Sequence, residues 1–93
     1  MDNTSWIETN VEMVVSYLTK EFETFVLSYR ADRPLTHTFT VDNGKKQFQL
    51  IIEWRTLADR NFPPTNIDLL VKSNVAGEMR LHGEKGYYWT PST

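Results

Sequence analysis

The chain of 93 residues contains no cysteine, which excludes disulfide bonds, cysteine-based zinc sites and a thiol nucleophile. Its two histidines are a weak metal signal, because a typical zinc site needs three or four converging protein ligands. No apolar run approaches the roughly 20 residues of a membrane span, and the N-terminus lacks the basic and apolar regions of a signal peptide. We therefore expect a cytoplasmic protein that is neither secreted nor inserted in a membrane and that needs no metal or cofactor.

Sequence motifs for nucleotide binding and for nucleophilic catalysis are also missing. Gly83-Glu84-Lys85-Gly86 places a lysine between glycines, but it lacks both the GxxxxGK[ST] spacing and a following helix whose N-terminus would hold an anion. A hairpin turn is the favoured interpretation of these four residues. The motifs therefore indicate no enzyme class.

The composition is that of a folded globule: 40% of the residues are hydrophobic, 24% are charged and 13% are aromatic, unlike a disordered segment. A chain of this length forms one domain, because a divided core could not offset the conformational entropy lost on folding. Residues 1–93 are thus expected to form a single unit.

The formal charge of −2 is unevenly distributed along the chain. Residues 1–23 hold five acids against one lysine, a charge of −4, whereas the remaining seven acids and nine bases give +2. These bases are scattered rather than gathered in the dense stripe typical of a duplex-binding protein, whose affinity comes chiefly from phosphate neutralisation. The charge pattern argues against a dedicated binder of double-stranded nucleic acid.

The N-terminal segment has the period of an amphipathic helix. Thr4 or Ser5 can cap its start, and Glu8 and Glu12 on the opposite side favour a solvated face over a partner-binding acidic stripe. The apolar residues at helical spacing are Ile7, Val11, Val14 and Leu18.

The sequence alone does not determine where this helix ends, because the same helical register continues through Phe22, Phe25 and Tyr29. The stretch from Thr24 to Tyr29 is also rich in strand formers and alternates. We prefer a helix over about residues 5–22 followed by a strand from Thr24 to Arg30. A single 25-residue helix would be about 37 Å long and would overhang so small a domain.

A β-hairpin is predicted from Leu35 to Trp54. Asp42-Asn43-Gly44 interrupts two alternating runs, and Asn and Gly tolerate the positive φ of a tight turn. Each run places its apolar residues on one face, so the register of the pairing is specified from both ends. The two runs are Leu35/His37/Phe39/Val41 and Phe48/Leu50/Ile52/Trp54.

The C-terminal half is predicted to form a β-meander. Phe62-Pro63-Pro64 is a loop, since proline cannot donate to a sheet ladder. Apolar and polar residues then alternate in three short segments. The expected strands are residues 66–73, 78–82 and 87–89, with turns at 74–77 and 83–86 and a frayed tail at 91–93.

These elements predict an α+β fold, in which an N-terminal amphipathic helix packs on an antiparallel β-meander sheet of four to six strands over about residues 24–90. One helix cannot cover both faces of the sheet. The uncovered face is expected to bind a second subunit, giving a homodimer, because several apolar residues are predicted to lie on it. These residues are Val26, Ile51, Leu70 and Tyr88.

Three isolated ionisable residues have ordinary structural interpretations. His37 shares a face with apolar neighbours, which favours a satisfied histidine at the sheet edge over a metal ligand. Glu53 and Asp68 could face each other across neighbouring strands as paired carboxylates, although solvated sheet-face acids are favoured.

His82 lies in a small ionisable cluster with Glu78 and Arg80 on the polar face of its predicted strand and Glu84 two residues further on. Such a group could carry out general acid–base chemistry. The cluster is not the spacing of an established catalytic motif, so no catalytic residue is assigned.

The aromatic C-terminus is the main candidate binding surface. Tyr87, Tyr88 and Trp89 are consecutive, so a strand there must show aromatic rings on both faces. If Tyr87 and Trp89 point to the core, Tyr88 is exposed; the opposite register exposes two rings beside Arg80 and Lys85. These five residues are the predicted partner-binding set, since aromatic residues and arginine are enriched at interface hot spots.

Three function classes follow. The leading one is a non-catalytic protein-interaction module, a small regulator, adaptor or inhibitor, that binds a protein partner through its sheet edge and aromatic C-terminal strand. The second is a single-stranded nucleic-acid binder that uses aromatic residues together with Lys45, Lys46 and Arg80. The third is a small-molecule-binding or enzymatic α+β domain with a pocket between helix and sheet. Without a basic stripe, the protein interface is favoured over nucleic acid.

Overall fold

The computed structural model describes residues 3–32, 35–59 and 67–90. It has an α+β fold, with an N-terminal helix followed by a four-stranded sheet in the order β1-β2-β3-β4. Strands β1, β2 and β3 pair antiparallel, and β4 pairs parallel with β3. In chain order the elements are α1 (Asn3–Glu21), β1 (Val26–Asp32), β2 (Thr36–Asp42), β3 (Gln47–Glu53), α2 (Trp54–Ala58), α3 (Ile67–Lys72), α4 (Val75–His82), the 3₁₀ helix η1 (Gly83–Lys85) and β4 (Tyr87–Trp89).

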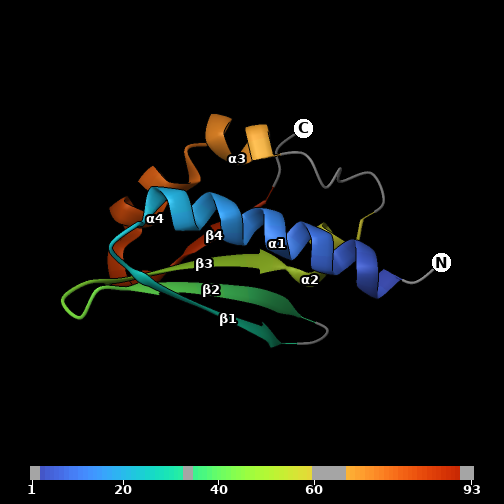
Figure 1. The fold of residues 1–93 in the computed structure, drawn as a ribbon, viewed down its shortest axis with the longest axis horizontal. Coiled ribbons are helices and arrows are strands. Elements are labelled where there is room, and N and C mark those ends of the chain that lie inside the picture. Colours follow the sequence, from blue (N-terminus) through green and yellow to red (C-terminus); the bar gives the residue numbers. More distant parts are fainter. Residues whose placement is uncertain (1–2, 33–34, 60–66, 91–93) are drawn as a thin grey trace.

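Figure 1 shows α1 running across the sheet, with α3 and α4 beside it. Alternate residues of β2 and β3 face these helices and are buried with them in one hydrophobic core, while the residues between face the open side. This is the period of two that the sequence predicts for the hairpin. The largest fully buried apolar side chains are Leu18 from α1, Phe39 from β2, Leu50 and Ile52 from β3, Leu57 from α2, Leu70 from α3 and Met79 from α4.

The preferred end of the first helix is confirmed. Helix α1 ends at Glu21, and β1 begins at Val26. Between them, the Phe22 N–H donates to the Leu18 carbonyl (2.8 Å) and the Phe25 N–H donates to the Phe22 carbonyl (3.0 Å). Phe22 is therefore still buried against the core while the chain turns into the sheet.

The central hairpin is confirmed from Thr36 to Glu53, whereas the predicted end residues differ: Leu35 is exposed before β2, and Trp54 begins α2. The Asp42 carboxylate accepts from the Gly44 N–H (2.7 Å), and the Asn43 side-chain oxygen accepts from the N–H groups of both Lys45 (2.9 Å) and Lys46 (2.7 Å). Gly44 has a φ of +88°, which costs little without a Cβ. Asx side chains thus replace backbone acceptors in the turn, and the register runs unbroken from Asp42↔Gln47 to Thr36↔Glu53.

Two predicted strands are wrong: the segments expected at 66–73 and 78–82 form helices α3 and α4, with Asn66 outside the described residues. Met79 and Leu81 alternate with polar residues in the sequence, as in a strand with one apolar face. In the structure, however, Met79 is fully buried whereas Leu81 is 79% exposed. Val75 and Met79, four residues apart, share the buried side of α4 instead, so helical packing overrides the short alternating pattern. Leu70, expected on the open sheet face, is fully buried in α3.

The last part of the sheet differs from a meander for the same reason. Residues 83–86 form η1 and its C-cap rather than a hairpin turn, and β4 joins β3 in parallel. A parallel pairing needs a long crossover connection, usually helical, and the segment with α3 and α4 supplies one. Within the described residues, no helix is long and apolar enough to span a bilayer.

Candidate functional site

The predicted aromatic surface is divided between the two faces of the sheet. The register of β4 pairs Tyr87 with Leu50, Tyr88 with Ile51 and Trp89 with Ile52. Trp89 is 2% exposed in the core, whereas Tyr88 is 69% exposed on the open face. Tyr87 is half-buried on the helix side, where burial raises the pKa of its hydroxyl. Tyr88 is thus the one ring of the three that is largely available to a partner.

The three basic residues predicted as nucleic-acid contacts, unlike the aromatic residues of β4, lie around one site. Lys45 and Lys46, from the β2–β3 turn, and Arg80, from α4, line one open pocket of about 580 Å³. Phe25 and Phe48 form the apolar part of the lining, and Glu84 is the acidic residue in it. The remaining lining residues are Asn43, Gln47 and Gly83. We call this site the basic pocket. Lys85, although predicted beside Arg80, is exposed on η1 and is not part of the lining.

The aromatic part of the basic pocket is a packed cluster at the junction of α1 and the sheet. The ring of Phe22 lies 5.2 Å from that of Phe25, edge to face, and 5.9 Å from that of Phe48. Phe25 and Phe48 are 5.8 Å apart. Offset and edge-to-face arrangements at these distances are the favourable ones for aromatic rings. The pocket therefore has a base of packed aromatic rings.

Arg80 has a structural role in addition to its place in the pocket. Its guanidinium carbon lies 4.4 Å from the centre of the Phe22 ring, and its Nη2 donates to the Glu21 carbonyl at 2.9 Å. A cation is favourable at this carbonyl because it is the C-terminal end of α1. The contact fixes the direction of the side chain, and a guanidinium has further donors that one backbone carbonyl does not use.

The charges of the basic pocket do not cancel one another. Three cations and one acid give the lining a formal charge of +2. The ion pairs found within the described ranges, Arg30–Asp32 and Arg55–Glu53, both lie elsewhere. An open, positively charged site next to aromatic rings is suited to a ligand that is anionic at one end and apolar at the other.

The ionisable cluster around His82 shows no arrangement for acid–base chemistry. The Nδ1 of His82 donates to the Glu78 carbonyl within α4 at 2.8 Å, and the His82 ring lies 5.0 Å from that of Tyr87. Asp68 lies in the first turn of α3 rather than on a strand beside β3, and Glu53 pairs with Arg55 at 2.9 Å, so the less favoured alternative, a pair of facing carboxylates, is not formed. Among the described residues, no three His, Asp or Glu side chains are grouped to hold a metal ion.

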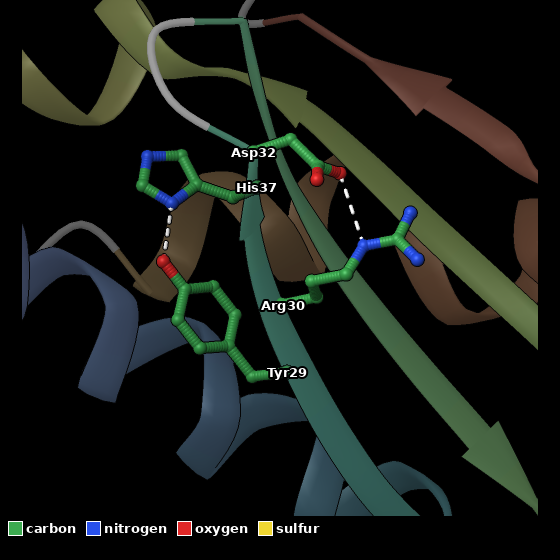
Figure 2. A network of polar contacts seen from close by, with 4 residues as sticks. All are labelled: Tyr29, Arg30, Asp32 and His37. Carbon is green, nitrogen blue, oxygen red and sulfur yellow. Dashed lines mark hydrogen bonds and ion pairs between the residues drawn. The ribbon is translucent and has the colours of Figure 1, made fainter.

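His37 is fully buried at one end of β2, an interior strand, rather than at the sheet edge as expected. Its Nδ1 shares a 2.6 Å hydrogen bond with the Tyr29 hydroxyl, and its ring stacks on that of Trp54 at 4.3 Å. Figure 2 shows the hydrogen bond between Tyr29 on β1 and His37 on β2. The geometry supports the interpretation of His37 as a structural residue.

The amino-acid sequence gives part of the basic pocket and misses part. Lys45 and Lys46 flank the predicted turn, but Phe25 carries no signal that separates it from other core residues, and Arg80 reaches the pocket only because α4 is a helix. Comparison with protein-family models finds no match, and the searches of curated proteins and of solved structures find none either. The function must be argued from the pocket itself.

Proposed function

We propose that this chain is a non-catalytic binding domain that holds an acidic segment of a protein partner in the basic pocket. The observation that supports the proposal is the convergence of Lys45, Lys46 and Arg80, from segments 34 or more positions apart in sequence, around the rings of Phe25 and Phe48. Such a site suits a peptide in which a carboxylate lies next to an apolar or aromatic side chain.

The size of the pocket agrees with a peptide ligand. A volume of about 580 Å³ falls within the range of roughly 300–1,000 Å³ that is usual for ligand pockets. It has room for one or two side chains, with carboxylates reaching the lysines at the rim. Arg80, already oriented by Phe22 and the Glu21 carbonyl, offers its remaining donors without the entropy cost of ordering a mobile chain.

An acidic peptide suits the charges better than single-stranded nucleic acid does. Proteins that bind single-stranded nucleic acid combine a basic groove that follows several phosphates with a row of exposed aromatic rings. Here the cations are confined to one end of the sheet, Glu84 lies among them, and Tyr88 is on the open face with the acids Asp32, Asp42 and Glu53 on the same side of the sheet. Because Asp32 is paired with Arg30 and Glu53 with Arg55, the described residues around Tyr88 offer a phosphate backbone no row of free cations to follow.

The test is an NMR titration of the labelled protein with a short synthetic peptide of alternating glutamate and phenylalanine. The expected result is saturable shifts of the backbone amides of Phe25, Lys45 and Phe48 together with the Arg80 side chain. A single-stranded oligonucleotide is titrated in parallel. Tighter binding of the oligonucleotide at these residues would replace this proposal with the nucleic-acid alternative, and the absence of peptide shifts at the pocket would overturn it.

Charge-reversal variants give the matched control. Lys45→Glu/Lys46→Glu should lower the affinity for the acidic peptide by at least about tenfold, or roughly 1.4 kcal/mol. Lys72→Glu, an exposed lysine of α3 outside the pocket lining, makes half of that charge change elsewhere and should leave the affinity within about twofold. Equal losses from the two variants would mean that the overall charge, rather than the pocket, determines binding.

A further inference from the structure

The sheet has one long edge. Strand β1 spans seven residues, Val26–Asp32, and in the strand order its only neighbour among the described strands is β2. The opposite edge, β4, is three residues long and pairs in parallel. An edge strand can add a further strand by main-chain hydrogen bonding, and β1 is the strand here with the length to do so.

Strand β1 has few of the features that usually protect an edge from such pairing. Natural edges carry charged residues, especially lysine, or proline or a bulge; the β1 sequence VLSYRAD has neither lysine nor proline, and its two charged residues form an ion pair with each other. Its register with β2 runs without interruption from Val26↔Asp42 to Asp32↔Thr36, so it contains no bulge. The strand is therefore regular and suited to pairing along its whole length.

The charges of β1 are compensated within the strand. Arg30 and Asp32 lie on the same face, two residues apart, and the Arg30 Nε is 3.1 Å from an Asp32 carboxylate oxygen. Figure 2 shows this ion pair along the strand. A second copy of β1 brought alongside would meet an edge with no net charge, so charge repulsion does not oppose self-association.

The apolar side of β1 continues the core beyond the cover of α1. Leu27, Tyr29 and Ala31 are the partners of the buried residues Val41, Phe39 and His37 on β2, and so face the helix side. Yet Leu27 is only half-buried, Ala31 is exposed and Tyr29 is 39% exposed. A second β1 would bring the same apolar row against this one, which makes the edge complementary to itself.

We propose that β1 pairs antiparallel with β1 of a second copy of this chain, about a two-fold axis at Ser28, joining the two sheets into one. Because the same surface is used by both copies, the assembly closes as a dimer instead of growing into a filament. A contact along one strand of seven residues buries an area at the low end of specific interfaces, so the dimer is weak. Antiparallel pairing sets the two basic pockets at opposite ends of the joined edge.

Analytical ultracentrifugation of the full chain from about 1 µM to about 1 mM tests the proposal, because a weak interface of this kind dissociates within that range. The expected result is a reversible monomer–dimer equilibrium. Ser28→Lys places a lysine on the open face of the edge, where it faces the same lysine of the other copy, and should weaken the dimer by at least about tenfold. Gln49→Lys, in the same row of the same face but on β3, is the matched control and should leave it unchanged.

The position of the contact is tested separately. Because the chain has no cysteine, Ser28→Cys supplies a single thiol next to the proposed axis and should give a disulfide-linked dimer on mild oxidation, whereas Gln49→Cys should not. A monomer throughout the concentration range would overturn the proposal. So would a dimer that Ser28→Lys and Gln49→Lys weaken equally, or one that neither variant weakens. Because no ligand is present, failure here leaves the proposed function of the basic pocket untouched.

Discussion

The two ends of the sheet carry aromatic clusters that differ in what surrounds them. At one end, Tyr29, His37 and Trp54 pack face to face, and we call this the closed end. At the other, Phe22, Phe25 and Phe48 lie beneath the basic pocket. The polar groups of the closed end contact one another within the protein, whereas the cations of the pocket face an open space.

Hydrogen bonds between distant segments reinforce the closed end. The Trp6 indole N–H donates to the Asp59 carbonyl at 2.9 Å, and the buried Asn10 side chain donates to the Leu57 carbonyl at 2.8 Å. Both bonds join α1 to α2 or to the residue after it. The comparison indicates that polar groups at the closed end stabilise the fold, while those of the basic pocket are available to a ligand, and mutations at the two ends should separate these roles.

The largest effect is expected from His37→Ala at the closed end. The substitution leaves a cavity against Trp54 and removes the partner of the Tyr29 hydroxyl, so the free energy of unfolding should fall by about 2–4 kcal/mol. Denaturation with guanidinium chloride measures this loss. A loss below about 1 kcal/mol would mean that the closed end does not stabilise the fold as its burial indicates.

Tyr17→Phe should have the next largest effect, because it releases α4 and with it one wall of the basic pocket. The Tyr17 hydroxyl accepts a hydrogen bond from the buried Ala76 N–H at 3.0 Å. Without it that N–H has lost its acceptor, at a cost of about 1–3 kcal/mol. Hydrogen exchange should show faster opening of α4 while the amides of β2 stay protected. Equal acceleration in both elements would contradict an effect centred on α4.

The same residue predicts a loss of stability in alkali. Burial raises the pKa of the Tyr17 hydroxyl above its ordinary value of 10.0, so the folded protein keeps a proton that the unfolded chain releases. The contribution of this hydroxyl to the free energy of unfolding is therefore fully present below about pH 10. It is lost as the pH rises from there through the pKa of the folded state. The decline should be smaller in Tyr17→Phe than in the wild type. It should not vanish, because the pKa of Tyr87 is raised in the same direction.

Arg80 belongs to both roles, and its replacement should have an intermediate effect on stability. Arg80→Ala loses the contact with the Phe22 ring and the hydrogen bond to the Glu21 carbonyl, which should cost about 1 kcal/mol at this exposed position. Arg80→Lys keeps the charge but loses the planar donor group. Arg80→Lys should recover less than half of the affinity for the acidic peptide that Arg80→Ala loses. Full recovery would show that charge alone matters at this position.

The sequence predicts the N-terminal half of the fold because its signals there are local. The Asx turn at Asp42-Asn43-Gly44 and the alternation on either side specify the hairpin without help from the rest of the chain. The C-terminal half depends on what it packs against. Only the core shows that Val75 and Met79 share a buried side and that Leu81 does not, and without α4 the parallel pairing of β4 cannot be foreseen.

The candidate site follows the same division. Lys45 and Lys46 are found from the sequence because they flank a predictable turn, and Arg80 is noticed as a basic residue near aromatic ones. Their convergence is not predictable, since it requires α4 to place Arg80 over Phe22 at the end of α1. Trp89 shows the converse: an aromatic residue that resembles an interface anchor in the sequence is part of the core.

The smallest effect on stability is expected from Lys45→Ala/Lys46→Ala in the basic pocket. Both side chains are exposed, and the turn is held by their backbone N–H groups and the Asn43 side chain, which alanine preserves. The free energy of unfolding should stay within about 0.5 kcal/mol of the wild type, while the affinity for the acidic peptide falls. Asn43→Ala is the contrasting variant, since it removes the acceptor of both turn N–H groups and should destabilise the hairpin by about 1 kcal/mol. If the double lysine variant were the more destabilised of the two, the lysines would belong to the folding of the turn, and the distinction between the two ends of the sheet would fail.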